Sequence, residues 1–227
     1  MKNAYTSTSC FSSLDPHVSH GFRALVFLGA LSIGCVGGEL ETDDGSVFRD
    51  DADPVESAAF AIRTDTGFQW PLDRVESGDA NFGSCGSAYY TGLRHNGADL
   101  SAIVTTRVYA VADGTVRAIS GPAASSGWGE GNYGVAIEHR SSAGSFIAIY
   151  GHIRNLTVRV GSRVTRSTLI GQVGPYAGGN HLHFGIRPGT TVPSSGWGRI
   201  SDPRCSNPTN LNGFVAPITY LKTNRPS

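Results

Sequence analysis

The run His181-Leu182-His183-Phe184 places two imidazoles two residues apart. Successive side chains of a β-strand point to opposite faces, so His181 and His183 would share one face while Leu182 and Phe184 face a core. Two imidazoles on one face can bind a single metal ion, or one can bind it while the other transfers protons. Taken alone, such a pair is more typical of an ordinary half-exposed strand.

A second pair of metal-binding side chains, His95 and Asp99, lies far upstream with Gly97 between them. Imidazole and carboxylate are both zinc ligands, and Gly97 would let the backbone curve so that both reach one ion. One histidine from the downstream pair would complete a set of two imidazoles and one carboxylate. The fourth position stays open, which is typical of a catalytic zinc site rather than a structural one.

Two further histidines follow strand-like segments. His152 ends the run Tyr150-Gly151-His152, whereas His139 ends an apolar segment and matches no catalytic pattern, so we predict a structural role for His139. Neither the serines nor the cysteines suggest a nucleophilic triad.

Short β-strands are the elements expected to position these residues. Residues 108–112 and 115–119 flank Asp113-Gly114, a combination that predicts a hairpin with a tight I′ turn. Residues 134–139 and 145–150 predict a second strand pair joined by a Ser/Gly turn. No convincing amphipathic helix is present. Together with thirty glycines, this pattern predicts an all-β fold, a compact antiparallel sheet or sandwich.

Two long loops, 121–131 and 189–206, each contain the sequence Ser-Ser-Gly-Trp-Gly. Exposed tryptophans there, Trp128 and Trp197, would line a groove for a polymeric substrate. Chance recurrence in glycine-rich loops is the simpler alternative.

The N-terminal region predicts export. Residues 24–34 are apolar, follow Arg23 and are too short to span a bilayer comfortably, so residues 1–35 are interpreted as a signal peptide. The segment ends at Cys35 in a pattern similar to a bacterial lipoprotein signal, although Ser32 stands where leucine is expected. Lipidation of Cys35 and simple secretion remain alternatives. Both predict a periplasmic, outer-membrane-anchored or extracellular protein.

The distribution of charged residues distinguishes a linker from a folded domain. Residues 39–56 contain eight acidic residues against Arg49 alone, and we interpret 36–60 as an acidic flexible linker before a folded domain at 61–227. From Ser57 onward fifteen Lys and Arg stand against nine Asp and Glu, an excess that would draw the domain to an anionic matrix. A solvated arginine face explains the excess equally well.

The presumed folded part contains two cysteines, Cys85 and Cys205. In an oxidising compartment such a pair most simply forms one disulfide, and no CxxC spacing supports metal binding instead.

The order of the motifs resembles that of a known family. The motifs are Trp70-Pro71, His95-x-x-x-Asp99, Ala112-Asp113-Gly114-Thr115-Val116, Tyr150-Gly151-His152, Ile170-Gly171 and His181-Leu182-His183-Phe184. In this order they resemble the lysostaphin-type zinc endopeptidases, the β-lytic class of bacterial cell-wall hydrolases, from about Phe68 to Leu221. The resemblance implies a lysostaphin-like fold, a barrel-sandwich hybrid with long loops around a zinc groove.

The resemblance also implies roles for individual residues. His95, Asp99 and His183 would hold one Zn²⁺, and His152 and His181 would be the catalytic histidines. We expect His181 to act as general base and His152 to stabilise the oxyanion, with the reverse division left open. The sequence departs from the family's pattern at Gly185, where an acidic residue often stands, and this bears on substrate preference.

The expected activity is zinc-dependent hydrolysis of peptide bonds in peptidoglycan cross-links. A non-hydrolytic regulator or binding module for wall hydrolases is one alternative, although relatives of that kind lack some of the five residues. A zinc peptidase acting on protein substrates is another. The expected partner is the peptidoglycan peptide, not nucleic acid, with contact to a membrane only through lipid on Cys35, and we expect a monomer.

Overall fold

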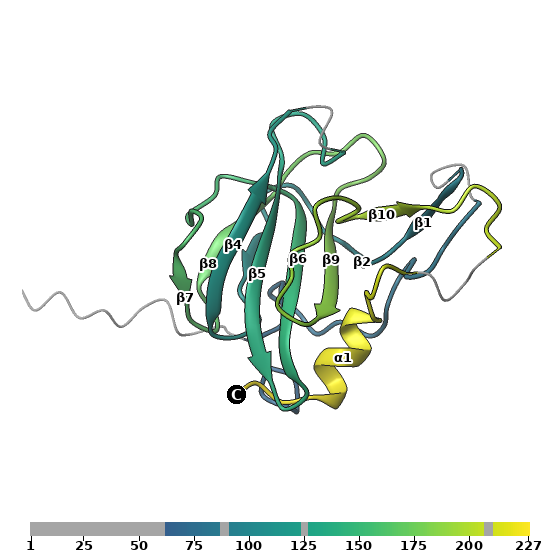
Figure 1. Ribbon diagram of the computed structural model, residues 1–227. Coiled ribbons are helices and arrows are strands. Elements are labelled where there is room, and N and C mark those ends of the chain that lie inside the picture. Colours follow the sequence, from purple (N-terminus) through teal and green to yellow (C-terminus); the bar gives the residue numbers. More distant parts are fainter. Residues whose placement is uncertain (1–61, 87–90, 124–126, 207–210) are drawn as a thin grey trace, which may run out of the picture. The chain divides into compact units, whose positions relative to one another are not determined.

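The computed structural model describes residues 62–86, 91–123, 127–206 and 211–227 (Figure 1). The predicted signal peptide, the acidic linker and Cys35 therefore lie outside the described residues. The elements are β1 (Leu93–His95), β2 (Ala98–Ser101), β3 (Arg107–Tyr109), β4 (Gly114–Ser120), β5 (Tyr133–Ser141), β6 (Gly144–Arg154), β7 (Arg163–Val164), β8 (Leu169–Val173), β9 (His181–Pro188), β10 (Arg199–Ser201) and α1 (Pro217–Thr223). Within the described ranges, no helix is both long and apolar enough to cross a membrane.

The strands form an antiparallel sheet whose order is β2-β9-β6-β5-β4-β7, with β8 pairing both β3 and β6. A separate two-stranded ribbon joins β1 to β10. Figure 1 shows the ribbon beside the end of the sheet that carries β2 and β9. The predicted all-β class is confirmed.

The predicted strand pair at 134–139 and 145–150 is the centre of the sheet. β5 and β6 form a hairpin whose tight end pairs Ser141 with Gly144. Alternate side chains of β6 enter two cores: Phe146 and Tyr150 lie in the larger one, Ile147 and Ile149 in a smaller one on the other face. Because both faces are buried, β6 gives a rigid base from which other strands can present a site.

The predicted hairpin around Asp113-Gly114 is wrong. β3 pairs with β8, whereas β4 pairs with β5 and β7. The glycine serves a different purpose, since a Cβ on Gly114 would lie 2.4 Å from the Glu138 carbonyl oxygen and 2.6 Å from His139 Nδ1. Gly114 therefore permits close packing of β4 against β5, whereas the Asp-Gly sequence is also typical of a tight turn.

The sequence does not predict the short helix α1. Its N-cap residue, Ala216, makes no side-chain capping bond, but Pro217 begins the helix and a remote carboxylate caps it. Asp79 accepts hydrogen bonds from the backbone N–H groups of Ile218 and Thr219 at 2.6 and 3.1 Å. A cap supplied from 139 residues away leaves no local signal.

A disulfide joins Cys85 to Cys205, as predicted, with their Cα atoms 5.7 Å apart. Beside it, Arg94 donates two hydrogen bonds to Oδ2 of Asp202 at 2.9 and 2.8 Å, and both residues are buried. Arg94 lies on β1, whereas Asp202 and Cys205 follow β10, so both links secure the end of the ribbon where Leu93 pairs with Ser201. The strand β10 also occupies part of the segment that the sequence predicted to be a long loop.

His139 has the structural environment expected of it. Its Nδ1 donates to the Asp113 carbonyl at 3.1 Å, and its Nε2 lies 3.3 Å from the Tyr150 hydroxyl. The ring is buried against Phe146, and burial lowers the pKa of His139 to about 4.

We therefore expect His139 to contribute to acid sensitivity. The unfolded chain takes up a proton at this residue near pH 6.5, and the folded chain only near pH 4, so folding stability falls as the pH drops between these values. The loss is about 3 kcal/mol and stops below pH 4. Denaturant unfolding of wild type and His139→Gln across this range tests it, because the variant should lack this part of the slope. Equal slopes would contradict the assignment.

Candidate metal and catalytic site

The pairing of β2 with β9 brings distant residues together. Asp99 lies directly opposite His183, and Ser101 lies opposite His181. The intervening pairs, Ala98 with Phe184 and Leu100 with Leu182, face the core. The period of two along both strands therefore places the two histidines and the carboxylate on one face.

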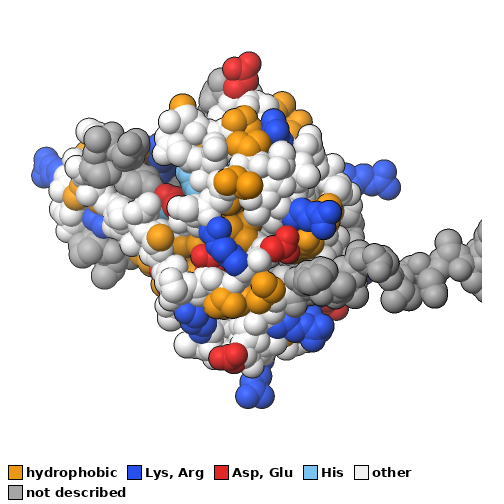
Figure 2. Space-filling model, turned by 180° about the vertical axis from the view of Figure 1, so that it is seen from behind, with side chains coloured by type: hydrophobic (Ala, Val, Ile, Leu, Met, Phe, Trp, Pro, Cys, Tyr) orange, Lys and Arg blue, Asp and Glu red, His pale blue; other side chains and the backbone are white. Residues whose placement is uncertain are grey.

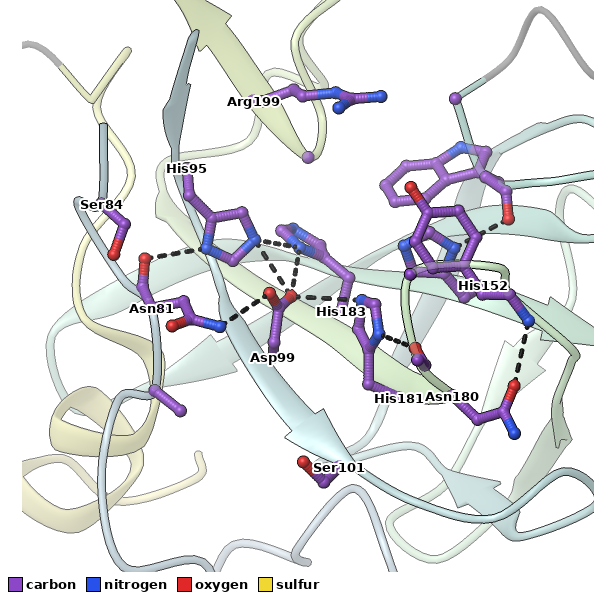
Figure 3. Close-up of a pocket in the computed structure, with 17 residues that line it drawn as sticks. Asn81, Ser84, His95, Asp99, Ser101, His152, Asn180, His181, His183 and Arg199 are labelled. Atoms are coloured by element: carbon purple, nitrogen blue, oxygen red, sulfur yellow. Dashed lines mark hydrogen bonds and ion pairs between the residues drawn. The ribbon is translucent and has the colours of Figure 1, made fainter. Parts of the chain in front are cut away.

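Three side chains converge at this face (Figure 3). His95 Nε2 lies 2.8 Å from His183 Nδ1 and 3.1 Å from Asp99 Oδ1, and His183 Nδ1 lies 3.5 Å from the same oxygen. One potential ligand atom from each of His95, Asp99 and His183 falls within 4.8 Å of the others. His95 reaches the cluster from the end of β1, where the chain crosses from the ribbon to the sheet.

Hydrogen bonds at the rear of His95 set its orientation. Nδ1 of His95 lies 3.0 Å from the carbonyl oxygen of Asn81, and since a carbonyl only accepts, Nδ1 carries the proton. In the neutral form of His95, this arrangement directs the Nε2 lone pair into the cluster. Asn81 also donates from Nδ2 to Asp99 Oδ2 at 3.2 Å, so one residue supports two of the three groups.

Gly97 is required for a reason that the sequence did not reveal. A Cβ at this position would lie 2.5 Å from both Cε1 and Nε2 of His183 and 2.8 Å from the Phe184 carbonyl oxygen. Its backbone φ is not in the left-handed region. Gly97 therefore makes room for the His183 ring instead of providing a bend between His95 and Asp99.

The electrostatics favour a negative Asp99 carboxylate beside a neutral His183 imidazole. Burial acts to raise the pKa of Asp99, but its interactions with the adjacent His183 and His95 outweigh burial and hold the pKa well below its usual range. Burial also lowers the pKa of His183 to about 4. At neutral pH Asp99 and His183 therefore have the protonation states that a divalent metal requires.

His152 lies where β6 changes partners. Gly151 still pairs with His183 on β9, whereas Ile153 already pairs with Val173 on β8. Between them His152 has φ 58°, a left-handed conformation that non-glycine residues rarely adopt. Such conformations gather at functional sites, and this one turns the imidazole toward the histidines of β9.

The two remaining histidines are held in the same manner as His95. His152 Nδ1 donates to the Trp128 carbonyl at 2.7 Å, and His181 Nδ1 donates to the Gly179 carbonyl at 2.6 Å. Their ring centroids are 4.5 Å apart, and His181 Nε2 lies 3.4 Å from Asp99 Oδ1. Burial, followed by the neighbouring His181, lowers the pKa of His152 to about 3, so this residue is neutral at neutral pH.

Trp128 is buried, contrary to the expectation of an exposed groove residue. Its ring covers the glycines of two strands, since a Cβ on Gly134 or Gly151 would lie 2.4 or 2.1 Å from the indole. The same ring contacts His152 and His183, with centroids 5.4 and 5.6 Å away. Trp128 therefore forms the rear wall of the site. Trp197 is half-buried and donates to the Pro193 carbonyl.

A cleft of about 510 Å³ opens over the histidines. The sequence did not point to several residues that line it, including Asn81, Tyr176 and Arg199. Tyr176 lies with its ring centroid 4.1 Å from that of His152. No local signal marks these residues, because none belongs to a motif; Asn81 and Tyr176 lie between strands, and Arg199 is on β10.

Asn132 supports His152 through the backbone of Trp128. Its side-chain amide donates to the carbonyls of Trp128 and Pro175 at 3.1 and 2.7 Å, and the first of these carbonyls also accepts from His152. The side chain is buried so tightly that a Cβ on Gly174 would lie 1.9 Å from Asn132 Oδ1.

Asn132→Ala is expected to lower turnover about 10- to 100-fold because His152 loses its fixed position. The same change should cost about 1–3 kcal/mol of folding stability. Steady-state turnover assays and denaturant unfolding measure both effects. Asn224→Ala is the matched control, since Asn224 donates from its amide to the Tyr220 carbonyl on α1 and not at the site. Equal turnover in the two variants would contradict the supporting role.

The solved structures that this chain resembles include peptidases. A putative M23 peptidase from Pseudomonas aeruginosa is 22% identical over 57% of this chain, with TM-score 0.37; the chain covers 51% of that protein, about half its length. The catalytic domain of the antimicrobial peptidase lysostaphin from Staphylococcus simulans is 21% identical over 65% of this chain and 91% of its own, with TM-score 0.43. A zinc-containing peptidase from Vibrio cholerae is 24% identical, and the match covers 56% of this chain and 35% of the Vibrio protein, with TM-score 0.37.

No curated protein matches the sequence significantly. The family model described as peptidase family M23 does match, over residues 93–194. The matched segment contains His95, Asp99, His152, His181 and His183, the five residues that the cleft brings together. The resemblance to the lysostaphin-type peptidases is thereby confirmed for the segment that matches the model of peptidase family M23.

Proposed function

We propose that this chain is a zinc-dependent endopeptidase that hydrolyses peptide bonds in peptidoglycan cross-links. The observation that carries the proposal is the convergence of His95, Asp99 and His183 beside two further histidines within one cleft. His95, Asp99 and His183 would hold the metal, and His152 and His181 would act on the substrate.

The donor set fits a zinc ion. His95 Nε2 and Asp99 Oδ1 are 3.1 Å apart, and with His95 neutral both are hydrogen-bond acceptors. Two acceptors at this distance are stable only with a proton or a cation between them. Two imidazoles and one carboxylate are also a combination that zinc prefers. When bound, zinc polarises the scissile carbonyl and activates water for attack at neutral pH.

The protonation states suggest how the catalytic histidines divide the work. His152 is neutral and its Nδ1 proton is engaged by Trp128, so its Nε2 can only accept a proton. This does not suit the predicted role of a protonated stabiliser. We therefore propose that His152 takes the proton of the attacking water. His181, which is the more exposed of the two and faces Asp99, would stabilise the developing oxyanion and deliver a proton to the leaving amine.

Two other functions use the same fold. A non-hydrolytic regulator would not need the full set of five side chains, so their common orientation favours an enzyme. A peptidase acting on proteins would share the whole site, and the substrate therefore has to be established by experiment.

The remaining properties are proposals of the same kind. We propose an exported monomer that meets peptidoglycan in the periplasm or outside the cell, with lipidation of Cys35 as the only route to a membrane anchor. On the face seen in Figure 2, basic and acidic side chains are interspersed instead of forming one basic patch. This face therefore lacks the continuous basic surface that nucleic-acid binding requires.

The test uses purified peptidoglycan of several cross-link types and a denatured protein substrate. We expect release of new amino groups from at least one wall type and none from the protein, with activity lost after chelation and restored by zinc. Cleavage of the protein alone would support the protein-substrate alternative. Zinc binding without hydrolysis of any substrate would support the regulator.

A further inference from the structure

An arginine from the β1–β10 ribbon, Arg199, lines the cleft. Arg199 lies opposite His95 in the register of the ribbon, and side chains of directly opposite residues project from the same face. In Figure 3 the Arg199 side chain extends across the opening on the far side of the histidine cluster from Ser101. It is half-buried and forms no ion pair with any described residue.

Arg199 also marks the boundary between two hollows. A second hollow of about 340 Å³ adjoins the cleft, and the two share Gly127, Trp128, Gly198 and Arg199 as lining residues. A Cβ on Gly127 would lie 3.6 Å from Arg199 Nη2, so the guanidinium reaches the loop on the other side of the groove. A substrate chain running from one hollow to the other would pass beside it.

Few charged side chains line the groove that the two hollows form. Among the described residues that line the two hollows, Arg199 is the only Lys or Arg and Asp99 the only Asp or Glu. Asp99 is engaged by His95 and His183. A guanidinium in this position has five donors in a fixed fork, which matches a carboxylate in geometry and charge.

The fold fixes the strand that carries this side chain. Its strand is fixed through the Cys85–Cys205 disulfide and through the buried pair of Arg94 and Asp202. Gly198, just before it, lies against the Trp128 ring, since a Cβ there would be 3.2 Å from the indole. The backbone that carries the cation is therefore positioned before substrate arrives, which reduces part of the cost of binding.

We propose that Arg199 determines specificity by binding a substrate carboxylate next to the scissile amide. When the amine of a cross-link comes from a carbon that also carries a carboxylate, this carboxylate is only two bonds from the amide nitrogen. Such cross-links are the preferred substrates, ahead of those in which the same group is amidated and ahead of oligoglycine bridges, which have none. This inference rests on the proposed peptidase function and names the substrate class for that site.

The test compares two synthetic cross-linked peptides that differ only in a free or an amidated carboxylate beside the scissile bond. We expect wild type to have about tenfold higher kcat/KM on the free form, mostly through KM. Arg199→Gln should lose this preference because its kcat/KM on the free form falls to its value on the amidated form, and Arg199→Lys should recover part of the preference. Arg163→Gln, which removes an exposed charge on β7, should behave as wild type. An unchanged preference in Arg199→Gln would overturn the inference.

Binding separates failure of the inference from failure of the proposed function. The affinity of the full chain for the same two peptides is measured without turnover, after chelation of metal. A preference for the free carboxylate that disappears in Arg199→Gln would support the inference even if neither peptide were cleaved. Equal affinities would overturn it even if both were cleaved.

Discussion

His183→Ala is expected to eliminate zinc binding and peptidase activity together. His183 is buried, and its Nδ1 faces both His95 Nε2 and Asp99 Oδ1. Removing it leaves two of the three proposed ligands. Loss of a residue that only orients a ligand typically costs 10- to 100-fold in metal affinity, so loss of a ligand should exceed about 100-fold. Metal content after gel filtration and hydrolysis of purified walls provide the two measurements.

The control for this variant is His139→Gln, which replaces another buried histidine outside the cleft. At neutral pH it should retain zinc and activity. Unfolding curves of both variants distinguish loss of the metal from loss of the fold. His183→Ala that kept one zinc per chain with wild-type affinity would remove this residue from the ligand set.

His152→Ala is expected to retain zinc and lose turnover. His152 adjoins the cluster through His181 but has no atom in the proposed ligand set. Since a positioned general base contributes about 10²- to 10⁴-fold, kcat should fall by this range while KM changes little. Rapid-quench or steady-state assays with one synthetic cross-linked peptide measure the effect, with zinc content determined on the same samples.

Comparison with His181→Ala tests how the two histidines divide the work. If His152 is the base, added imidazole should restore part of the activity of His152→Ala and little of that of His181→Ala. The opposite pattern of rescue would return the base to His181, as first expected from the sequence. Loss of zinc from His152→Ala would show instead that this residue is a ligand.

Much of the site could be predicted because its residues are local motifs on strands. The alternation in His181-Leu182-His183 predicts one polar and one apolar face, and the structure shows both, with Leu182 in the core. What the sequence could not give was the register. The pairing of Asp99 with His183 and of Ser101 with His181 depends on contacts between segments about 80 residues apart.

Two glycines show why the rest was missed. From the sequence, Gly97 predicts a curved backbone and Gly114 a tight turn. In the structure, each glycine leaves space for a histidine ring of a neighbouring strand. A sequence shows that a side chain is absent but not which atoms fill the space. The same limit applies to Trp128, whose burial depends on Gly134 and Gly151 beneath its ring.

The most direct test of the central claim is a zinc titration of the metal-free full chain with peptidoglycan hydrolysis followed on the same samples. We predict that hydrolysis rises linearly and reaches its maximum at one equivalent of zinc per chain. His181→Ala should bind the same single equivalent and remain inactive. Full hydrolysis by the metal-free protein, or a chain that binds no zinc, would contradict the assignment of His95, Asp99 and His183 as a catalytic metal site.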